Sequence, residues 1–213
     1  MNVQWRLFLA ALRYVIPGPS PNSSELQPRE AARFVPLAGI LVGLLGGFVY
    51  WLAVDIWPAS VALMLSLLAT ALATGEMQQR GTAWIFALLI KYNALMALSA
   101  AHTPIPLPDD AALGFIMVAG HAASRALVVS VMVNRPRGAD ADLGIALCLG
   151  LAPAALLGIP GLVGLAAAIA TRMVLTALVL PKLPAEPRAR LATTQQFTEI
   201  GLYLGALAAW RYI

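Results

Sequence analysis

The chain has 213 residues, of which 60% are apolar and 11% are charged, and its mean hydropathy is +0.80. A soluble domain carries about 25% charged residues, so the composition excludes a disordered chain and argues against a water-soluble globule or a nucleic-acid-binding domain. The single cysteine, Cys148, excludes an internal disulfide framework and a cysteine-based metal cluster. The net charge of +4 is therefore interpreted through the topology of a membrane protein.

Residues 1–16 predict an amphipathic helix at the membrane surface rather than a cleaved signal peptide. Arg6 and Arg13 interrupt the apolar run, and the sequence PGPSP follows it instead of a small-residue cleavage site. Trp5 and Tyr14 are residue types that anchor a helix at the membrane interface. We expect this interfacial helix to precede the first membrane span.

Seven apolar segments follow, separated by proline- and glycine-rich breaks. A spanning helix needs about 20 apolar residues, and the segments lie near 36–54, 57–74, 83–101, 111–133, 143–158, 160–180 and 196–213. The expected fold class is an all-α polytopic helix bundle that forms one integral membrane domain over residues 1–213. The fifth and sixth segments have almost no polar residue between them, so a re-entrant pair is an alternative to two full spans.

Basic residues gather on one side of this predicted topology. With the N-terminus in the cytoplasm, the cytoplasmic segments carry ten of the 14 Lys and Arg residues and the external loops carry none. This is a positive-inside distribution. It predicts a multi-pass protein of a bacterial-type cytoplasmic (inner) membrane, with anionic membrane lipid rather than nucleic acid as a partner.

A stripe of small residues marks the first predicted span. Gly39, Gly43 and Gly47 recur every four residues and form one smooth helix face. In lipid, such a face lets two helices approach closely. We interpret the stripe as a packing surface, which also leaves room for a homo-oligomer.

Five ionisable residues lie inside the predicted spans, and such residues are costly in a bilayer and are candidates for function. They are Lys91, His121, Arg125, Arg172 and Glu199. If Glu199 faces the bundle, its expected partner is Arg125, Arg172 or Lys91. Two interpretations stay open. One is a basic, cytoplasm-facing cavity that holds an anion such as a phosphate ester, since guanidinium groups bind phosphate bidentately. The other is a set of buried structural ion pairs.

Six short segments occur in an order that is typical of one enzyme family. They read FLAALRYVIPGPSP at 8–21, RFVPLAGILVGLLGG at 33–47, ALATGEMQ at 71–78, RGTAW at 80–84, SRALVVSVMVNRPRG at 124–138 and TTQQFTEIGLYLGAL at 193–207. Together they resemble the cobalamin synthase family, adenosylcobinamide-GDP ribazoletransferase, nearly from end to end.

The resemblance implies a transferase that joins α-ribazole to adenosylcobinamide-GDP and releases GMP in the last steps of cobalamin synthesis. It implies Mg²⁺ as the cofactor and a corrinoid nucleotide with α-ribazole as partners. The positions that match the family's motifs give the candidate site residues. The substrate-binding candidates are Gln78, Arg80, Lys91 and Arg125. The catalytic candidates are Glu76 and Glu199, and Glu76 is the only acid near the expected metal.

The sequence departs from the family's pattern in its acids. About 30 residues, with the family's acidic stretch His-x-Asp-Gly-x-x-Asp-x-x-Asp, are missing between Gln78 and Arg80, and Gln78 replaces the histidine. The Thr-Gly-Asp that the family has before its last span reads Pro187-Arg188-Ala189 here. Because carboxylates hold Mg²⁺ in such sites, no ligand set is found. We therefore expect weak or absent turnover, as in a pseudoenzyme. The alternative is a non-catalytic membrane scaffold or small transport protein on the same bundle.

Overall fold

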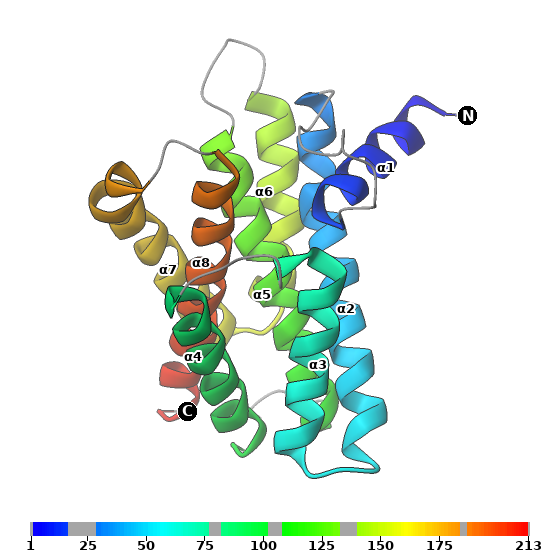
Figure 1. The fold of residues 1–213 in the computed structure, drawn as a ribbon, viewed down its shortest axis with the longest axis vertical. Coiled ribbons are helices and arrows are strands. Elements are labelled where there is room, and N and C mark those ends of the chain that lie inside the picture. Colours follow the sequence, from blue (N-terminus) through cyan, green and yellow to red (C-terminus); the bar gives the residue numbers. More distant parts are fainter. Residues whose placement is uncertain are drawn as a thin grey trace.

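The chain folds into a bundle of helices, shown in the computed structural model of Figure 1. The structure describes residues 2–16, 29–76, 82–101, 108–132, 140–183 and 187–212, and these contain no β-strand. The α-helices are α1 (Val3–Val15), α2 (Val35–Val54), α3 (Ala59–Thr74), α4 (Thr82–Ser99), α5 (Asp109–Met132), α6 (Asp140–Ala155), α7 (Ile159–Val174) and α8 (Pro187–Trp210). Three shorter turns are the 3-10 helix η1 (Arg29–Phe34), the π-helical η3 (Leu175–Val179) and the 3-10 helix η4 (Leu180–Lys182). The all-α fold class is confirmed.

The helix boundaries follow the breaks in the sequence. Helix α3 begins after Pro58, which cannot continue a preceding helix, and ends at Gly75 in the left-handed conformation (φ 69°). The Gly75 N–H donates to the carbonyls of Ala71 and Leu72, so the last turn of α3 is capped. Gly158, also at φ 69°, reverses the chain between α6 and α7. Glycine is suited to both turns because it has no Cβ to clash at positive φ.

Each of the helices α2 to α8 overlaps one predicted span, although α8 begins nine residues before the predicted 196–213, and seven membrane crossings are not shown. Three stretches are long and apolar enough to cross a membrane: Glu30–Val54, Ala111–Ser130 and Ile159–Lys182. The apolar stretches of α3, α4 and α6 are shorter, at Ala59–Thr74, Ala83–Ser99 and Asp142–Ala155. A 16-residue helix rises about 24 Å, compared with about 30 Å of bilayer hydrocarbon.

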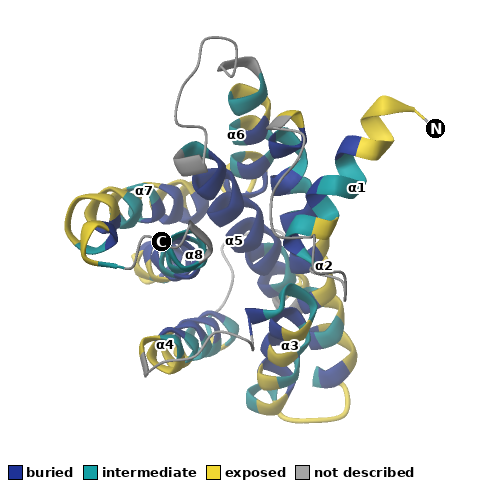
Figure 2. Ribbon diagram, turned by 45° about the horizontal axis from the view of Figure 1, so that its top comes forward, coloured by how far each residue is buried: buried dark blue, intermediate teal, exposed yellow. Residues whose placement is uncertain are grey.

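Helix α5 is the centre of the bundle. Within its apolar stretch Ala111–Ser130, 89% of the 18-residue window that qualifies as a membrane span is buried inside the protein. Figure 2 shows α5 in the middle, with α2, α6 and α8 around it, while α4 stands away from it. Helix α7 packs on α8 and α3 packs on α2. A helix with the composition of a membrane span is thus surrounded mainly by protein.

The glycine stripe of α2 packs against α5. A Cβ built on Gly43 would collide with the backbone of Val118, and a Cβ on Gly39 would lie 2.6 Å from the carbonyl oxygen of His121. A Cβ on Gly47 would also meet the α5 backbone, at 3.0 Å. The packing interpretation is therefore confirmed. Because α5 covers the stripe, these three glycines do not form the contact of a homo-oligomer, which stays untested.

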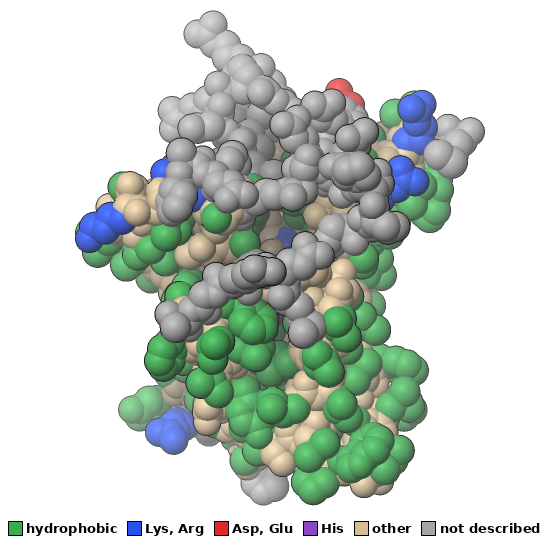
Figure 3. Space-filling view, viewed as in Figure 1, with side chains coloured by type: hydrophobic (Ala, Val, Ile, Leu, Met, Phe, Trp, Pro, Cys, Tyr) green, Lys and Arg blue, Asp and Glu red, His purple; other side chains and the backbone are tan. Residues whose placement is uncertain are grey.

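The outer surface of the bundle is apolar along its length. Large exposed side chains include Phe48 and Trp51 on α2, Met64 on α3 and Phe86 on α4, each more than half exposed. In Figure 3 the visible face is mostly apolar, and most of its visible Lys and Arg side chains lie at its upper part, with one patch at the lower left. This distribution suits a protein surrounded by lipid with charged ends.

Helix α1 is fixed to the bundle by both apolar and polar contacts. Its buried residues are Leu7, Ala11 and Val15. Arg33 of η1 donates to Oε1 of Gln4 at 2.6 Å and pairs with Asp142 of α6 at 3.1 Å. The position of α1 at a membrane interface remains a prediction.

Candidate functional site

A cluster of ionisable side chains is buried between α4, α5 and α8. Lys91 lies on α4, His121 and Arg125 lie one turn apart on α5, and Glu199 lies on α8. None of these four is more than 2% exposed. The sequence predicted each of them from its position inside an apolar span, and the fold brings them together.

Glu199 is the acceptor at the centre of this cluster. Nζ of Lys91 lies 3.1 Å from its Oε1 atom, and the hydroxyl of Tyr203 donates to the same oxygen at 2.9 Å. Nδ1 of His121 lies 3.4 Å from Oε2. The Tyr203 ring lies directly against Gly120, where a Cβ would collide with it. The carboxylate is thus held by groups from three helices.

Of the three predicted partners of Glu199, Lys91 is the one that forms the ion pair. Arg125 contacts His121 instead: its Nη1 atom donates to the His121 carbonyl at 3.2 Å and lies 3.2 Å from His121 Nδ1. Arg172, on α7, donates to the Ser130 carbonyl at 3.5 Å. Of the three alternatives, the structure thus selects Lys91, and Arg125 and Arg172 form no ion pair with Glu199 in the described part of the chain.

Nδ1 of His121 lies between two polar groups, Nη1 of Arg125 at 3.2 Å and Oε2 of Glu199 at 3.4 Å. An arginine N–H can only donate, so a hydrogen bond from Nη1 to Nδ1 requires the tautomer that carries its proton on Nε2. Nη1 also donates to the His121 carbonyl. Residue His121 therefore contacts the guanidinium through both its ring and its backbone.

Arg125 keeps two unused donors. Its Nε and Nη2 atoms are buried and have no hydrogen-bond partner among the described residues, and the same holds for Nε2 of His121. Buried N–H donors without an acceptor are costly. These donors of Arg125 and His121 thus have no acceptor among the described residues.

A second carboxylate lies where α3 ends. Glu76 is 7% exposed, and Nε2 of Gln195 donates to its Oε1 atom at 3.1 Å. Gln195 precedes Glu199 by one turn of α8. Glu76 forms no direct ion pair with Arg125 among the described residues. Both catalytic candidates therefore lie on the same side of α8: Glu199 belongs to this helix, and Glu76 contacts it through Gln195.

Two predicted substrate-binding residues lie outside the described residues. Gln78 and Arg80 belong to the segment 77–81, directly after Glu76. Two other contacts were not predicted, those of Tyr203 and Gln195. They lie four residues after and four residues before Glu199, so the helical spacing around that acid was the signal that pointed to them.

The described side chains do not fit the Mg²⁺ site that the family resemblance implies. No group of three His, Cys, Asp or Glu that could hold a metal ion occurs in the described part of the chain. Glu199 is engaged by Lys91 and Tyr203, and Glu76 by Gln195. Mg²⁺ usually takes oxygen ligands from one or two carboxylates together with waters and substrate phosphates. No carboxylate pair of that kind is formed here.

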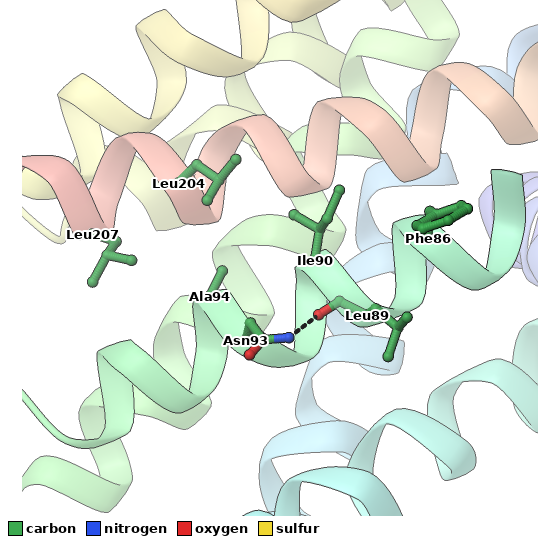
Figure 4. A pocket seen from close by; sticks show the side chains of 7 residues that line it. All are labelled: Phe86, Leu89, Ile90, Asn93, Ala94, Leu204 and Leu207. Atoms are coloured by element: carbon green, nitrogen blue, oxygen red, sulfur yellow. Dashed lines mark hydrogen bonds between the residues drawn. The ribbon is translucent and has the colours of Figure 1, made fainter.

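An apolar groove of about 300 Å³ runs between α4 and α8 (Figure 4). Its lining consists of Phe86, Leu89, Ile90, Asn93, Ala94, Leu204 and Leu207. The one amide among them, Asn93, donates to the Leu89 carbonyl at 2.8 Å. The groove is therefore lined almost entirely by apolar side chains, and the ionisable groups of this region belong to the buried cluster around Lys91 and Glu199.

Comparison with known proteins gives matches to one family. The profile of the family described as Cobalamin-5-phosphate synthase matches residues 7–83. An adenosylcobinamide-GDP ribazoletransferase of Ralstonia nicotianae is 35% identical over 137 residues, covering 49% of this chain and 50% of the relative. The protein of the same name from Shewanella sp. strain W3-18-1 is 28% identical over 160 residues, covering 59% and 58%. No solved structure matches the chain. The alignments thus span about half the length of these relatives.

The alignments also contain a gap. The Ralstonia alignment runs over 137 positions, while 49% of this 213-residue chain is about 104 residues. The Shewanella alignment runs over 160 positions, while 59% of the chain is about 126 residues. In each case about 33 positions have no residue in this chain. Their total is similar to the number of residues expected to be missing between Gln78 and Arg80, and the place of that deletion stays a prediction.

Proposed function

We infer from this chain's relationship to the cobalamin synthase family, supported by the family profile and the curated relatives, that it acts in cobalamin assembly. We propose that it binds adenosylcobinamide-GDP and transfers α-ribazole to it weakly or not at all. The main support for the proposal is the buried cluster of Lys91, Arg125 and Glu199, together with Glu76, which contacts the same helix α8 through Gln195. Such a cluster can bind a phosphate and accept a proton.

In the proposed transfer, the α-ribazole hydroxyl attacks the phosphorus that links cobinamide to GMP. A new P–O bond forms, the P–O bond to GMP breaks, and the hydroxyl proton passes to a base. Glu76 is the better candidate base, because Glu199 is already held by Lys91 and Tyr203. Glu199 then positions Lys91, while Arg125 neutralises charge on the phosphate groups.

The same geometry explains why we propose slow turnover. In phosphoryl transfer, positioned cations stabilise charge on the transferred group, and metal ions held by carboxylates supply much of that charge. The described carboxylates do not form such a set, and no step is assigned here to Mg²⁺. Side-chain cations alone can still bind the phosphate groups of the substrate, but they stabilise the transition state less than they would together with a metal ion.

The test uses purified chain in detergent with adenosylcobinamide-GDP, α-ribazole and Mg²⁺. We expect saturable binding of adenosylcobinamide-GDP, followed by the visible absorbance of the corrinoid, and little or no release of GMP. Glu76→Ala removes the proposed base, and Glu30→Ala, at an exposed acid of η1, is the matched control. Robust turnover abolished by Glu76→Ala alone would contradict slow catalysis and identify the base. A chain that does not bind the corrinoid nucleotide would refute the proposed function.

The charge balance of the cluster favours a second candidate, a membrane scaffold or small transport protein. Lys91 and Glu199 neutralise each other at 3.1 Å, as in a purely structural ion pair. Such a protein needs no phosphate ligand. Normal folding without any corrinoid binding is the result that would select it.

We further propose a multi-pass location in a bacterial-type cytoplasmic membrane, with the N-terminus inside and anionic lipids as neighbours. Its support is the basic composition of the segments at one end of the bundle.

A further inference from the structure

The two unused donors of Arg125 lie on one edge of its guanidinium group. In arginine the Nε–H and one Nη2–H bond point the same way, and this edge binds two oxygens of a carboxylate or phosphate side by side. Nη1, on the other side, is already occupied by His121. The free edge is therefore the one that is suited to bidentate recognition of an anion.

The surrounding residues hold this edge in place and leave it without an acceptor. The side chain of Arg125 is 2% exposed, and its Cδ atom packs where Gly39 has no Cβ. Contacts with His121 restrain the guanidinium from the opposite side. Glu199 pairs with Lys91 through Oε1 and makes no hydrogen bond to Arg125, and Glu76 forms no direct ion pair with Arg125 among the contacts of the described residues. A buried, oriented guanidinium edge is thus matched to an oxygen anion that is not part of the described protein.

The described residues form no carboxylate cluster that could hold Mg²⁺ next to a phosphate, so the free edge of Arg125 is the group there that could bind a phosphate directly. We propose that Arg125 binds two oxygens of a phosphate or phosphoanhydride directly, so that the chain holds such a ligand without a divalent metal ion. The proposal rests on the proposed function in that it concerns the same site. In this proposal the guanidinium of Arg125 contacts the phosphate directly, whereas the family resemblance implies a contact through Mg²⁺.

Inorganic pyrophosphate is the probe for this site. The full-length chain in detergent is titrated with it by calorimetry, first in EDTA and then with excess Mg²⁺. We expect saturable binding in EDTA that Mg²⁺ does not tighten. Arg125→Lys keeps a positive charge but lacks the two-donor edge, so we expect its dissociation constant to rise about tenfold or more.

Arg33→Lys is the matched control, because the Arg33 guanidinium is already paired with Asp142. It is expected to bind pyrophosphate like the unmodified chain. Helical circular dichroism and the unfolding temperature show whether Arg125→Lys is folded. If it is not, Arg125→Met, which removes the buried guanidinium together with its two unpaired donors, serves as the second variant. Binding that requires Mg²⁺, binding unchanged by a folded Arg125 variant, or no binding in EDTA would each overturn the proposal.

Phosphate at this edge has two possible sources, a soluble ligand and a lipid headgroup. Repeating the titration in nanodiscs of phosphatidylglycerol and of phosphatidylcholine separates them. Loss of pyrophosphate binding in phosphatidylglycerol only identifies the headgroup as a competitor for Arg125, and equal binding in both identifies the soluble ligand. Pyrophosphate binding without corrinoid binding would refute the proposed function and leave the Arg125 site standing.

Discussion

At the residue scale, the pairing of Lys91 with Glu199 decides the electrostatics of the cluster. Both side chains are almost completely buried, so each needs the other to offset the loss of hydration. Tyr203 adds a hydrogen bond to the same carboxylate oxygen. The pair also leaves Arg125 without a carboxylate in direct contact, which is why that residue is the candidate for anion binding.

Breaking this pair from one side is predicted to destabilise the bundle more than removing both charges. Lys91→Met or Glu199→Gln alone leaves one buried charge and is expected to cost about 3–5 kcal/mol. The double variant is expected to cost clearly less than the sum. Unfolding in a detergent titration gives the three values. The partly exposed pair Arg33–Asp142, with side chains 21% and 29% exposed, is the control cycle, with an expected coupling of about 0–1 kcal/mol. Additive effects at Lys91 and Glu199 would contradict the pairing.

Removing the hydroxyl of Tyr203 is a milder test of the interactions that stabilise the Glu199 carboxylate. Tyr203→Phe removes one hydrogen bond to a charged acceptor and keeps the ring against Gly120, so a loss of about 1–3 kcal/mol is expected. Tyr212→Phe, at a 91% exposed tyrosine, is the control and is expected to leave stability unchanged. Equal stability of Tyr203→Phe and the unmodified chain would show that the hydroxyl does not support Glu199.

At the element scale, the α2–α5 contact positions the site. The glycines of α2 allow its backbone to lie against the backbone of α5, and this contact places Gly39 beside His121 and Arg125. Because the atoms facing these glycines are mainly backbone, a side chain there cannot be accommodated by a change of rotamer. The interface therefore sets the height and distance of the cationic residues relative to α8.

Gly43→Ala is predicted to separate the two helices. Its Cβ would collide with the Val118 backbone, and we expect a loss of about 1–3 kcal/mol or more together with a weaker cluster. Gly144→Ala on α6 is the control, since nothing lies within 4 Å of a Cβ there and alanine favours a helix. It is expected to be neutral or stabilising in the same unfolding measurement. A stabilising effect of Gly43→Ala would contradict the close contact.

At the scale of the whole molecule, the bundle has two distinct ends. Figure 1 places the N-terminus and the α2–α3 connection at opposite ends, with the C-terminus near the latter. Most of the Lys and Arg side chains that are visible in Figure 3 lie at its upper part, which is the N-terminal end, with one patch at the lower left. This arrangement suits the proposed orientation, with the basic end on the cytoplasmic side.

Cysteine labelling tests that orientation. In a Cys148→Ser background, Asp55→Cys introduces an exposed thiol at the α2–α3 connection, and Lys182→Cys introduces one at the end of η4. In intact cells a membrane-impermeant maleimide is expected to modify Asp55→Cys only, and after permeabilisation it is expected to modify both. Labelling of Lys182→Cys alone in intact cells would reverse the orientation.

The amino-acid sequence by itself determined the helical fold, the positions of α2 to α8 and the set of ionisable residues at the site. Apolar runs broken by proline and glycine leave few alternatives to helices, since backbone polar groups in an apolar solvent must pair within their own segment. The close-packing role of Gly39, Gly43 and Gly47 followed from their spacing of four. Tyr203 and Gln195 were not predicted, although they are one turn away from Glu199.

Only the tertiary structure decided which groups meet. The sequence offered Lys91, Arg125 and Arg172 as partners of Glu199, and helix packing selected Lys91. Helix packing also enclosed α5 inside the bundle, although α5 is long and apolar enough to cross a membrane. The physical reason is that the hydropathy of a segment indicates only whether it can lie in an apolar environment. Which side chains form ion pairs, and which donors stay unpaired, depends on how each helix is rotated about its axis and how far it is shifted along the bundle. Those two quantities are fixed by contacts between helices far apart in the chain, such as Gly39 of α2 against His121 and Arg125 of α5.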